Sequence, residues 1–188
     1  MHELILGGQK SGKSRCAEQR AADWMARSSG HEAWLLATAL PADEEMVARI
    51  ARHRAARSAR APGLHVREVN QDLPSAIEAH ATPSRLLVVD CLTLWLTQEL
   101  MPPGEPPLES AAWLPRVDGT ADALCAALAR ADGPVVLVSN EIGQGVVPLA
   151  REARAFVDAL GTLHQRVAAA CAQVTLMVAG IEMPVKRP

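Results

Sequence analysis

Residues 7–14 read GGQKSGKS and match the pattern G-x-x-x-x-G-K-[ST] at every position. Glycine lets the backbone of such a turn curl until several N–H groups point at phosphate oxygens. A helix that begins near Gly12 would add the positive end of its dipole to the same site. In this pattern Lys13 would bridge the β- and γ-phosphates of a nucleotide, and the Ser14 hydroxyl would bind Mg²⁺. The segment therefore predicts a loop that holds a nucleotide triphosphate.

A second metal-binding residue is expected elsewhere in the chain. Asp90 follows the apolar run of residues 86–89, at the point where a strand would end. An aspartate at this position binds the Mg²⁺ of many nucleotide-binding enzymes, directly or through water. The same residue could instead cap the helix that follows, and the two roles are compatible.

A basic segment adds a possible nucleophile. Residues 43–57 read DEEMVARIARHRAAR, with Met46, Val47 and Ile50 on one face and His53 among arginines on the other. Such a face is often only a solvated surface. Near a phosphate loop, however, the arginines could hold phosphates, and a neutral His53 imidazole could attack phosphorus. The spacing alone does not decide between these interpretations.

The elements that must position these residues alternate along the chain. Continuously apolar strands that alternate with helices are typical of a parallel sheet covered on both faces. The expected strands cover residues 3–6, 33–38, 64–69, 85–89, 135–139 and 174–179. The expected helices cover 12–27, 43–57 with Asp43 as cap, 73–81, 92–100, 122–131, and 149–173 with an interruption near Gly161. Residues 101–108 should form an irregular loop, and a short polar tail should follow residue 179. We predict one α/β domain over residues 1–188, with a mostly parallel sheet flanked by helices.

Composition limits the classes of partner and compartment. The net charge of −2 argues against a broad nucleic-acid or anionic-membrane footprint. No apolar run approaches the ~20 residues of a membrane span, and no secretory signal is apparent. The four cysteines (Cys16, Cys91, Cys125 and Cys171) lack metal-site spacing and should be reduced and mostly buried. These features predict a cytoplasmic enzyme.

Five sequence blocks, which occur in the same order as in a known family, cover nearly the whole chain. They are residues 5–18, residues 36–39 (LATA) together with the basic segment 43–57, residues 86–97, residues 135–148 and residues 161–181. The patterns E-M-x-x-R-I-x-x-H-x-x-x-R and S-N-E-x-G-x-G-x-x-P are the distinctive ones. With them the sequence resembles the bifunctional adenosylcobinamide kinase/adenosylcobinamide-phosphate guanylyltransferase family of cobalamin biosynthesis.

This resemblance implies a RecA-like P-loop domain that assembles as a homotrimer. It implies phosphorylation of adenosylcobinamide by ATP or GTP, with Mg²⁺ and with Lys13 in the catalytic site. It further implies transfer of GMP from GTP to adenosylcobinamide phosphate through a covalent GMP on His53. The implied nucleotide contacts are Gly7, Gly8, Gln9, Lys10, Ser11, Gly12, Lys13, Ser14, Ala37, Thr38, Ala39, Arg54, Ala55, Ala56, Arg57, Glu68 and Asp90, with Ser14 and Asp90 on the metal.

The chain departs from the family pattern after the basic helix and at His164, and one further residue, Glu141, is a candidate for the site. The segment after the basic helix reads LHVREV, after a short insertion at residues 58–63, where family members usually carry a tryptophan. His164 replaces a common asparagine, and we expect it on the helix surface or in a packing hydrogen bond. Glu141, in a polar turn at a strand's carboxyl end, is expected to contact substrate or metal.

Two further hypotheses stay open beside the bifunctional enzyme. The chain could retain only one of the two activities, since both would use the phosphate loop. It could also be a RecA-like nucleotide switch that binds a partner, although its compact length and the lone histidine of the basic helix argue against this.

Overall fold

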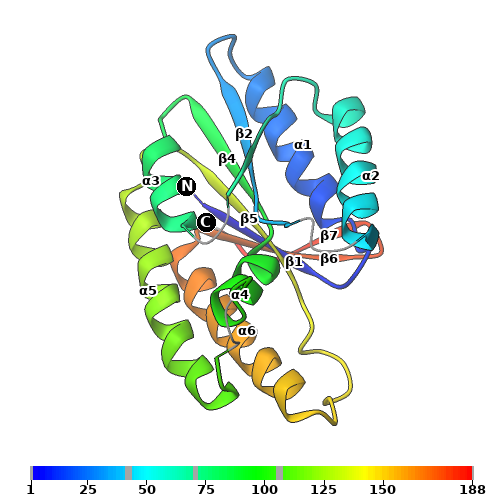
Figure 1. Cartoon of the computed structure of the whole chain (residues 1–188). Helices are drawn as coiled ribbons and strands as arrows, with labels where there is room; N and C mark the ends of the chain where they lie inside the picture. Colours follow the sequence, from blue (N-terminus) through cyan, green and yellow to red (C-terminus); the bar gives the residue numbers. More distant parts are fainter. Residues whose placement is uncertain (1, 41–43, 70–71, 105–107, 188) are drawn as a thin grey trace.

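A seven-stranded sheet forms the centre of the molecule (Figure 1). The computed structural model describes residues 2–40, 44–69, 72–104 and 108–187, without the side chains at 45, 46, 49, 53, 56 and 58. The strand order is β3-β2-β4-β5-β1-β6-β7, and only β7 runs antiparallel to its neighbour. The strands are β1 Glu3–Gly7, β2 Glu32–Ala37, β3 His65–Glu68, β4 Arg85–Asp90, β5 Val135–Asn140, β6 Gln173–Val178 and β7 Ile181–Lys186.

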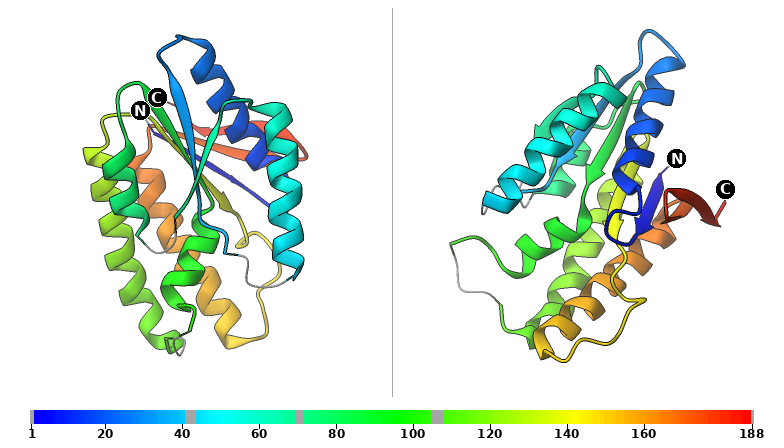
Figure 2. Two further views of the ribbon diagram at one scale, coloured as in Figure 1. Left: turned by 45° about the horizontal axis from the view of Figure 1, so that its top comes forward. Right: turned by 90° about the vertical axis from the view of Figure 1, so that its right-hand side faces the viewer.

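Helices cover both faces of this sheet (Figure 2). Helix α1 packs directly on one face of the sheet, and α2 lies on the same side and packs against α1. Helices α3 to α6 lie on the other face, where α5 and α6 run side by side (Figure 1). The helices are α1 Lys13–Ala26, α2 Glu44–Arg60, α3 Leu73–His80, α4 Leu92–Leu100, α5 Trp113–Arg130 and α6 Arg151–Ala170, with a 3-10 turn at Ser110–Ala112. No helix within the described ranges combines the length and apolar character that crossing a membrane requires.

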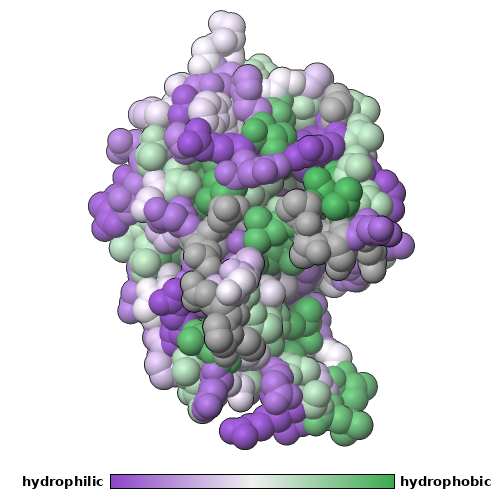
Figure 3. Space-filling model, in the orientation of Figure 1, coloured by the Kyte–Doolittle hydropathy of each residue, from purple (hydrophilic) through white to green (hydrophobic). Residues whose placement is uncertain are grey.

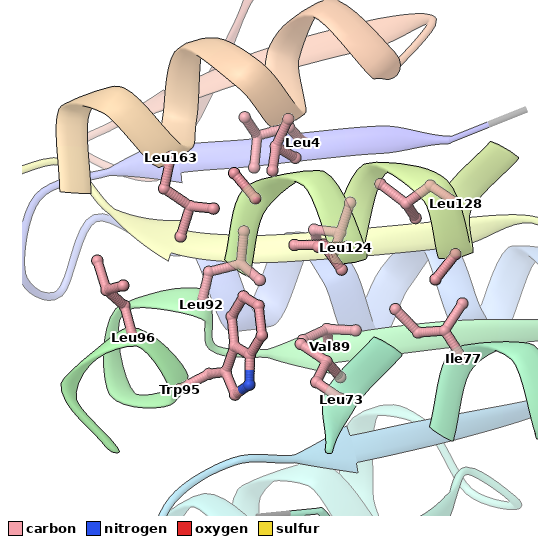
Figure 4. Close-up of a cluster of buried hydrophobic side chains, with 14 of the residues drawn as sticks. Leu4, Leu73, Ile77, Val89, Leu92, Trp95, Leu96, Leu124, Leu128 and Leu163 are labelled. Atoms are coloured by element: carbon pink, nitrogen blue, oxygen red, sulfur yellow. The ribbon is translucent and has the colours of Figure 1, made fainter. Parts of the chain in front are cut away.

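Two buried clusters explain why the strands read as continuous apolar runs. Successive side chains of a strand point to opposite faces of the sheet. In β4, Leu87 and Val89 therefore join the cluster under α3 to α6, whereas Leu86 and Val88 join the cluster under α1. The larger cluster centres on Trp95 and the leucines around it (Figure 4). The predicted doubly covered parallel sheet is thus confirmed.

The predicted helices differ from the observed ones mainly in their bounds. Helix α5 begins nine residues before the predicted start at 122, since it starts at Trp113. Pro115 lies in its first turn, where a missing N–H breaks no intrahelical hydrogen bond. Helix α6 continues through Gly161 because the buried Leu160 and Leu163 fix it against the core, which outweighs a glycine cost of about 1 kcal/mol.

Two more differences concern the basic helix and the C-terminus. Helix α2 continues to Arg60, so residues 58–60 of the expected insertion extend it. Of its expected apolar face, Val47 is half exposed and Ile50 lines a cavity. The side chain of Met46 and the expected cap Asp43 lie outside the described residues. The expected polar tail is instead strand β7, whose side chains are all exposed and which carries Pro184 at the sheet edge.

Candidate active site

The predicted phosphate loop has the expected geometry. It connects the end of β1 at Gly7 to the start of α1 at Lys13. Gly12 has a φ of 103°, which favours glycine, and Lys10 adopts a φ of 56°. A Cβ at Gly7 would lie 2.6 Å from the Met177 carbonyl oxygen, so this position has no room for a larger residue. The loop is therefore a compact turn that opens at the N-terminus of a helix.

The turn between β6 and β7 supports this loop from below. The Gly180 N–H donates to the Ser11 carbonyl over 2.9 Å. A Cβ at Gly12 would lie 3.3 Å from the Gly180 Cα, so the two backbones are in close contact. This support could not be predicted from the sequence, because the contact involves backbone atoms of a segment that was expected to be a polar tail.

Lys13 folds back over the loop rather than extending into solvent. Its side chain is buried, and its Nζ donates to the Gly8 carbonyl over 2.7 Å and lies 3.5 Å from the Ser11 hydroxyl. The ammonium group is therefore held inside the turn, where the lysine of such loops reaches the outer phosphates of a nucleotide.

A cavity of about 600 Å³, which we call the main cavity, opens beside the loop at the carboxyl ends of the strands. Its size lies in the range of small-molecule sites. The loop, the ends of β2, β4 and β5, strand β3 and helix α2 all contribute to its wall. The predicted residues on the wall are Gln9, Lys10, Ser11, Gly12, Lys13, Ser14, Ala37, Ala39, Arg54, Arg57, Glu68 and Asp90. Arg52, one of the arginines of the basic helix that could hold phosphates, also lines it, as do Arg15 and Asn140, for which no contact was predicted. The many cationic groups suit a polyanionic ligand.

The remaining predicted residues lie elsewhere. Thr38 is fully buried; its hydroxyl donates to the Cys91 carbonyl over 2.7 Å and accepts the Cys91 N–H over 2.8 Å. It therefore ties β2 to the start of α4 and does not line the cavity. Gly7 lies beneath the loop, and Ala55 is exposed on α2 outside the lining. The side chains of His53 and Ala56 lie outside the described residues, although both positions belong to α2.

Ser14 and Asp90 offer oxygen ligands to a metal ion on the same cavity wall. Within the described ranges, no three His, Cys, Asp or Glu side chains form a metal cage. Mg²⁺ does not need one, because it keeps several waters and binds one or two protein oxygens together with substrate phosphates. The donor set therefore fits Mg²⁺ that arrives with a nucleotide.

Buried and exposed ion pairs fix helix α2 against the site. Glu18 of α1 is almost fully buried and contacts two arginines of α2, with Arg57 Nε at 3.6 Å and Arg60 Nε at 2.6 Å. Arg54 pairs with Glu68 of β3 at 2.6 Å. The buried Arg57 Nε–H finds no hydrogen-bond acceptor among the described residues. Since Glu18 belongs to the helix that begins in the phosphate loop, its pairs with Arg57 and Arg60 couple α2 to the loop.

A second cavity of about 490 Å³ borders the same loop. It is lined by Gly8, Gln9, Lys10 and Ser11, by Glu141, Ile142, Gln144 and Gly145 after β5, and by residues 176–179. The connection after β5 exposes apolar side chains, with Val146 and Leu149 each 97% exposed. Hydrophobic atoms are visible at the lower right of Figure 3, where this connection lies in Figure 1.

A buried polar network lies behind the second cavity. The His164 Nε2 lies 2.7 Å from the Ser139 hydroxyl, which lies 3.1 Å from the Thr93 hydroxyl. The His164 Nδ1 lies 3.8 Å from Glu141 Oε2. Burial lowers the pKa of His164 to about 4, and the Glu141 carboxylate opposes that shift only in part. His164 is therefore neutral near pH 7, and its predicted packing hydrogen bond is confirmed.

Comparison with known proteins identifies the family. The family model described as "Cobinamide kinase / cobinamide phosphate guanyltransferase" matches residues 3–185. The chain belongs to this family. It is 45% identical to the bifunctional adenosylcobalamin biosynthesis protein CobP of Pseudomonas aeruginosa, over 99% of this chain and 98% of that protein. It is 36% identical to the protein CobU of Escherichia coli, over 97% of this chain and 98% of that protein.

Membership of the cobinamide kinase and guanyltransferase family confirms the resemblance drawn from the motifs. It favours the enzyme hypothesis over the nucleotide switch. The predicted reduced cysteines also agree with the structure, in which all four thiols are free and three are buried.

Proposed function

We propose that the chain phosphorylates the hydroxyl of adenosylcobinamide with ATP or GTP and then transfers GMP from GTP to the new phosphate. The products of the second step are adenosylcobinamide-GDP and pyrophosphate. The observation that carries this proposal is one cavity whose wall combines the phosphate loop with the arginines of α2. Family membership supplies the substrate class.

In the kinase step the protein mainly positions charge. Lys13 and the loop N–H groups hold the outer phosphates, where negative charge accumulates as the γ-phosphoryl group leaves. Ser14 and Asp90 would hold Mg²⁺, which neutralises phosphate charge when bound. The ammonium of Lys13 is already held at the loop, beside the Gly8 carbonyl and the Ser11 hydroxyl.

In the guanylyl step His53 acts as the nucleophile. Its imidazole nitrogen forms a bond to the α-phosphorus while the bond from that phosphorus to pyrophosphate breaks. A phosphate oxygen of adenosylcobinamide phosphate then attacks the same phosphorus and releases the imidazole. Arg54 and Arg57 line the cavity within one turn after His53, so they would stabilise charge on the reacting phosphates.

Covalent labelling tests the guanylyl step. The purified chain is incubated with α-labelled GTP, precipitated and washed. We expect label that is lost in acid and kept in alkali, absent in His53→Ala and present in the control His65→Ala, which removes an exposed histidine of β3. Label that persists in His53→Ala, or no label on folded protein that binds GTP, would refute the intermediate.

Product analysis tests whether both activities are present. Adenosylcobinamide with ATP should yield the phosphate, and separately supplied adenosylcobinamide phosphate with GTP should yield the GDP derivative. Absence of either product would show that the chain retains one activity. We also propose a homotrimer in the cytoplasm, for which sedimentation equilibrium should return three times the 20.0 kDa chain mass.

A further inference from the structure

We propose that the second cavity receives the alcohol-bearing arm of the kinase acceptor and that Glu141 accepts the proton of its hydroxyl. This inference rests on the proposed kinase function. It assigns the two reactions to two sides of one phosphate loop. The main cavity, with α2, serves the α-phosphorus, and the second cavity, to which no described residue of α2 contributes, serves the γ-phosphorus.

The position of Lys13 locates the γ-phosphate end of the site. The lysine of a phosphate loop reaches the β- and γ-phosphates. Lys13 Nζ lies 2.7 Å from the Gly8 carbonyl, so the outer phosphates should lie close to Gly8. Gly8 lines the second cavity, and a Cβ added there would meet no atom within 4 Å. An acceptor in this cavity would therefore approach the γ-phosphorus through open space.

Strand pairing places Glu141 beside this opening. Gly7 and Asn140 are partners in the parallel pairing of β1 and β5, and the Glu141 N–H donates to the Gly7 carbonyl over 2.9 Å. The Glu141 Oε1 accepts the Gly143 N–H over 2.6 Å, which orients the carboxylate. Its Oε2 lies 3.8 Å from His164, beyond hydrogen-bond distance, and so has lone pairs to offer.

The surroundings leave Glu141 as the best placed base. The acids on the main cavity wall are Glu68, which pairs with Arg54, and Asp90, whose place suits a metal ligand. Among the described residues of the second cavity, Glu141 is the one carboxylate, and its side chain is 20% exposed. The buried His164 and Ser139 lie behind it and hydrogen-bond each other, so neither competes with Glu141 for the substrate.

The acceptor oxygen forms a bond to the γ-phosphorus, and the bond from that phosphorus to the bridging oxygen breaks. The leaving nucleoside diphosphate keeps the electron pair, and the hydroxyl proton passes to Glu141 and then to water. A carboxylate in this role positions the nucleophile and contributes about 10²–10⁴-fold to the rate.

The test separates the two reactions in one variant. Glu141→Gln should lower the kinase kcat with adenosylcobinamide and ATP by about 10²-fold or more. Covalent labelling from GTP should stay at the level of the unaltered chain, because it needs only the main cavity. The matched control is Glu152→Gln, which alters an exposed glutamate in the first turn of α6 and should change neither activity. An unchanged kinase rate, or an equal loss of both reactions, would overturn the role of Glu141.

A second variant tests the cavity without touching the base. A Cβ at Gly145 would meet no atom within 4 Å, so Gly145→Leu can be introduced without a clash at the Cβ. It should raise the KM for adenosylcobinamide and leave GTP labelling unchanged. An unchanged KM would overturn the placement of the acceptor. Failure of the proposed function itself would look different, since the unaltered chain would then show neither label nor kinase product.

Discussion

Replacing Glu18 by glutamine tests how α2 is held in the site. The substitution keeps the size of the side chain and removes its negative charge. Glu18 is 3% exposed, and Arg57 beside it is 9% exposed, so both charges are shielded from water. Arg60 is 40% exposed at its side chain and can be solvated after the change. Most of the cost should therefore come from the uncompensated charge of Arg57.

The expected magnitude follows from this burial. Removing one partner of a buried ion pair costs about 3–5 kcal/mol. Since one of the two arginines is exposed, we expect the lower end, about 3 kcal/mol of unfolding free energy. With a urea slope of about 2–3 kcal/mol per molar, the unfolding midpoint should fall by about 1–1.5 M.

The assay is urea unfolding followed by circular dichroism, with a matched surface variant. Glu78 pairs with Arg130, and both side chains are well exposed. Glu78→Gln removes a surface pair and should cost at most about 1 kcal/mol. Equal midpoints for Glu18→Gln and Glu78→Gln would refute the claim that the buried carboxylate anchors α2.

The remaining predictions concern two glycines, His164 and Lys13. Gly133→Ala would place a Cβ 2.1 Å from the Thr82 carbonyl oxygen, so it should lower the unfolding free energy in urea by about 3 kcal/mol. In Gly119→Ala the new Cβ meets no atom within 4 Å. This substitution lies within helix α5 and should raise the unfolding free energy by about 0.5–1 kcal/mol. The pKa of His164 in the folded chain is lowered to about 4, so the unfolded chain binds a proton more readily below pH 6.5. The unfolding free energy should therefore fall by about 3 kcal/mol as the pH falls from 6.5 toward 4. Urea midpoints at pH 7 and pH 5 should therefore differ less in His164→Gln than in the unaltered chain. Lys13→Ala should abolish detectable GTP binding in isothermal titration calorimetry while changing the urea midpoint little, since it removes the cation that the loop holds for phosphate.

The sequence predicted the elements whose burial leaves a pattern. Strands such as β4 and β5 are covered on both faces, so each appears as an uninterrupted apolar run. The phosphate loop was predictable because its glycines and lysine have fixed spacing. Most of the predicted contact residues line one cavity for the same reason, since the carboxyl ends of parallel strands meet at one edge of the sheet.

Features that depend on contacts between residues distant in the sequence could not be predicted. Thr38 occupies a position expected to touch nucleotide, yet its hydroxyl bonds the backbone at Cys91, 53 residues later. Glu18 looks like an ordinary helix residue until α2 brings two arginines to it. All side chains of strand β7 are exposed, so its sequence lacks the alternation of apolar and polar residues that a half-buried strand shows. The strand is defined by its pairing with β6.

The contact between Gly180 and the phosphate loop links this loop to a segment that is synthesised long after it. A chain that ended at residue 178 would contain every residue of the loop but not the backbone donor beneath Ser11. During translation, the loop would gain its full support only after β7 had left the ribosome and paired with β6. Affinity for GTP could therefore report whether a newly made chain has completed its fold.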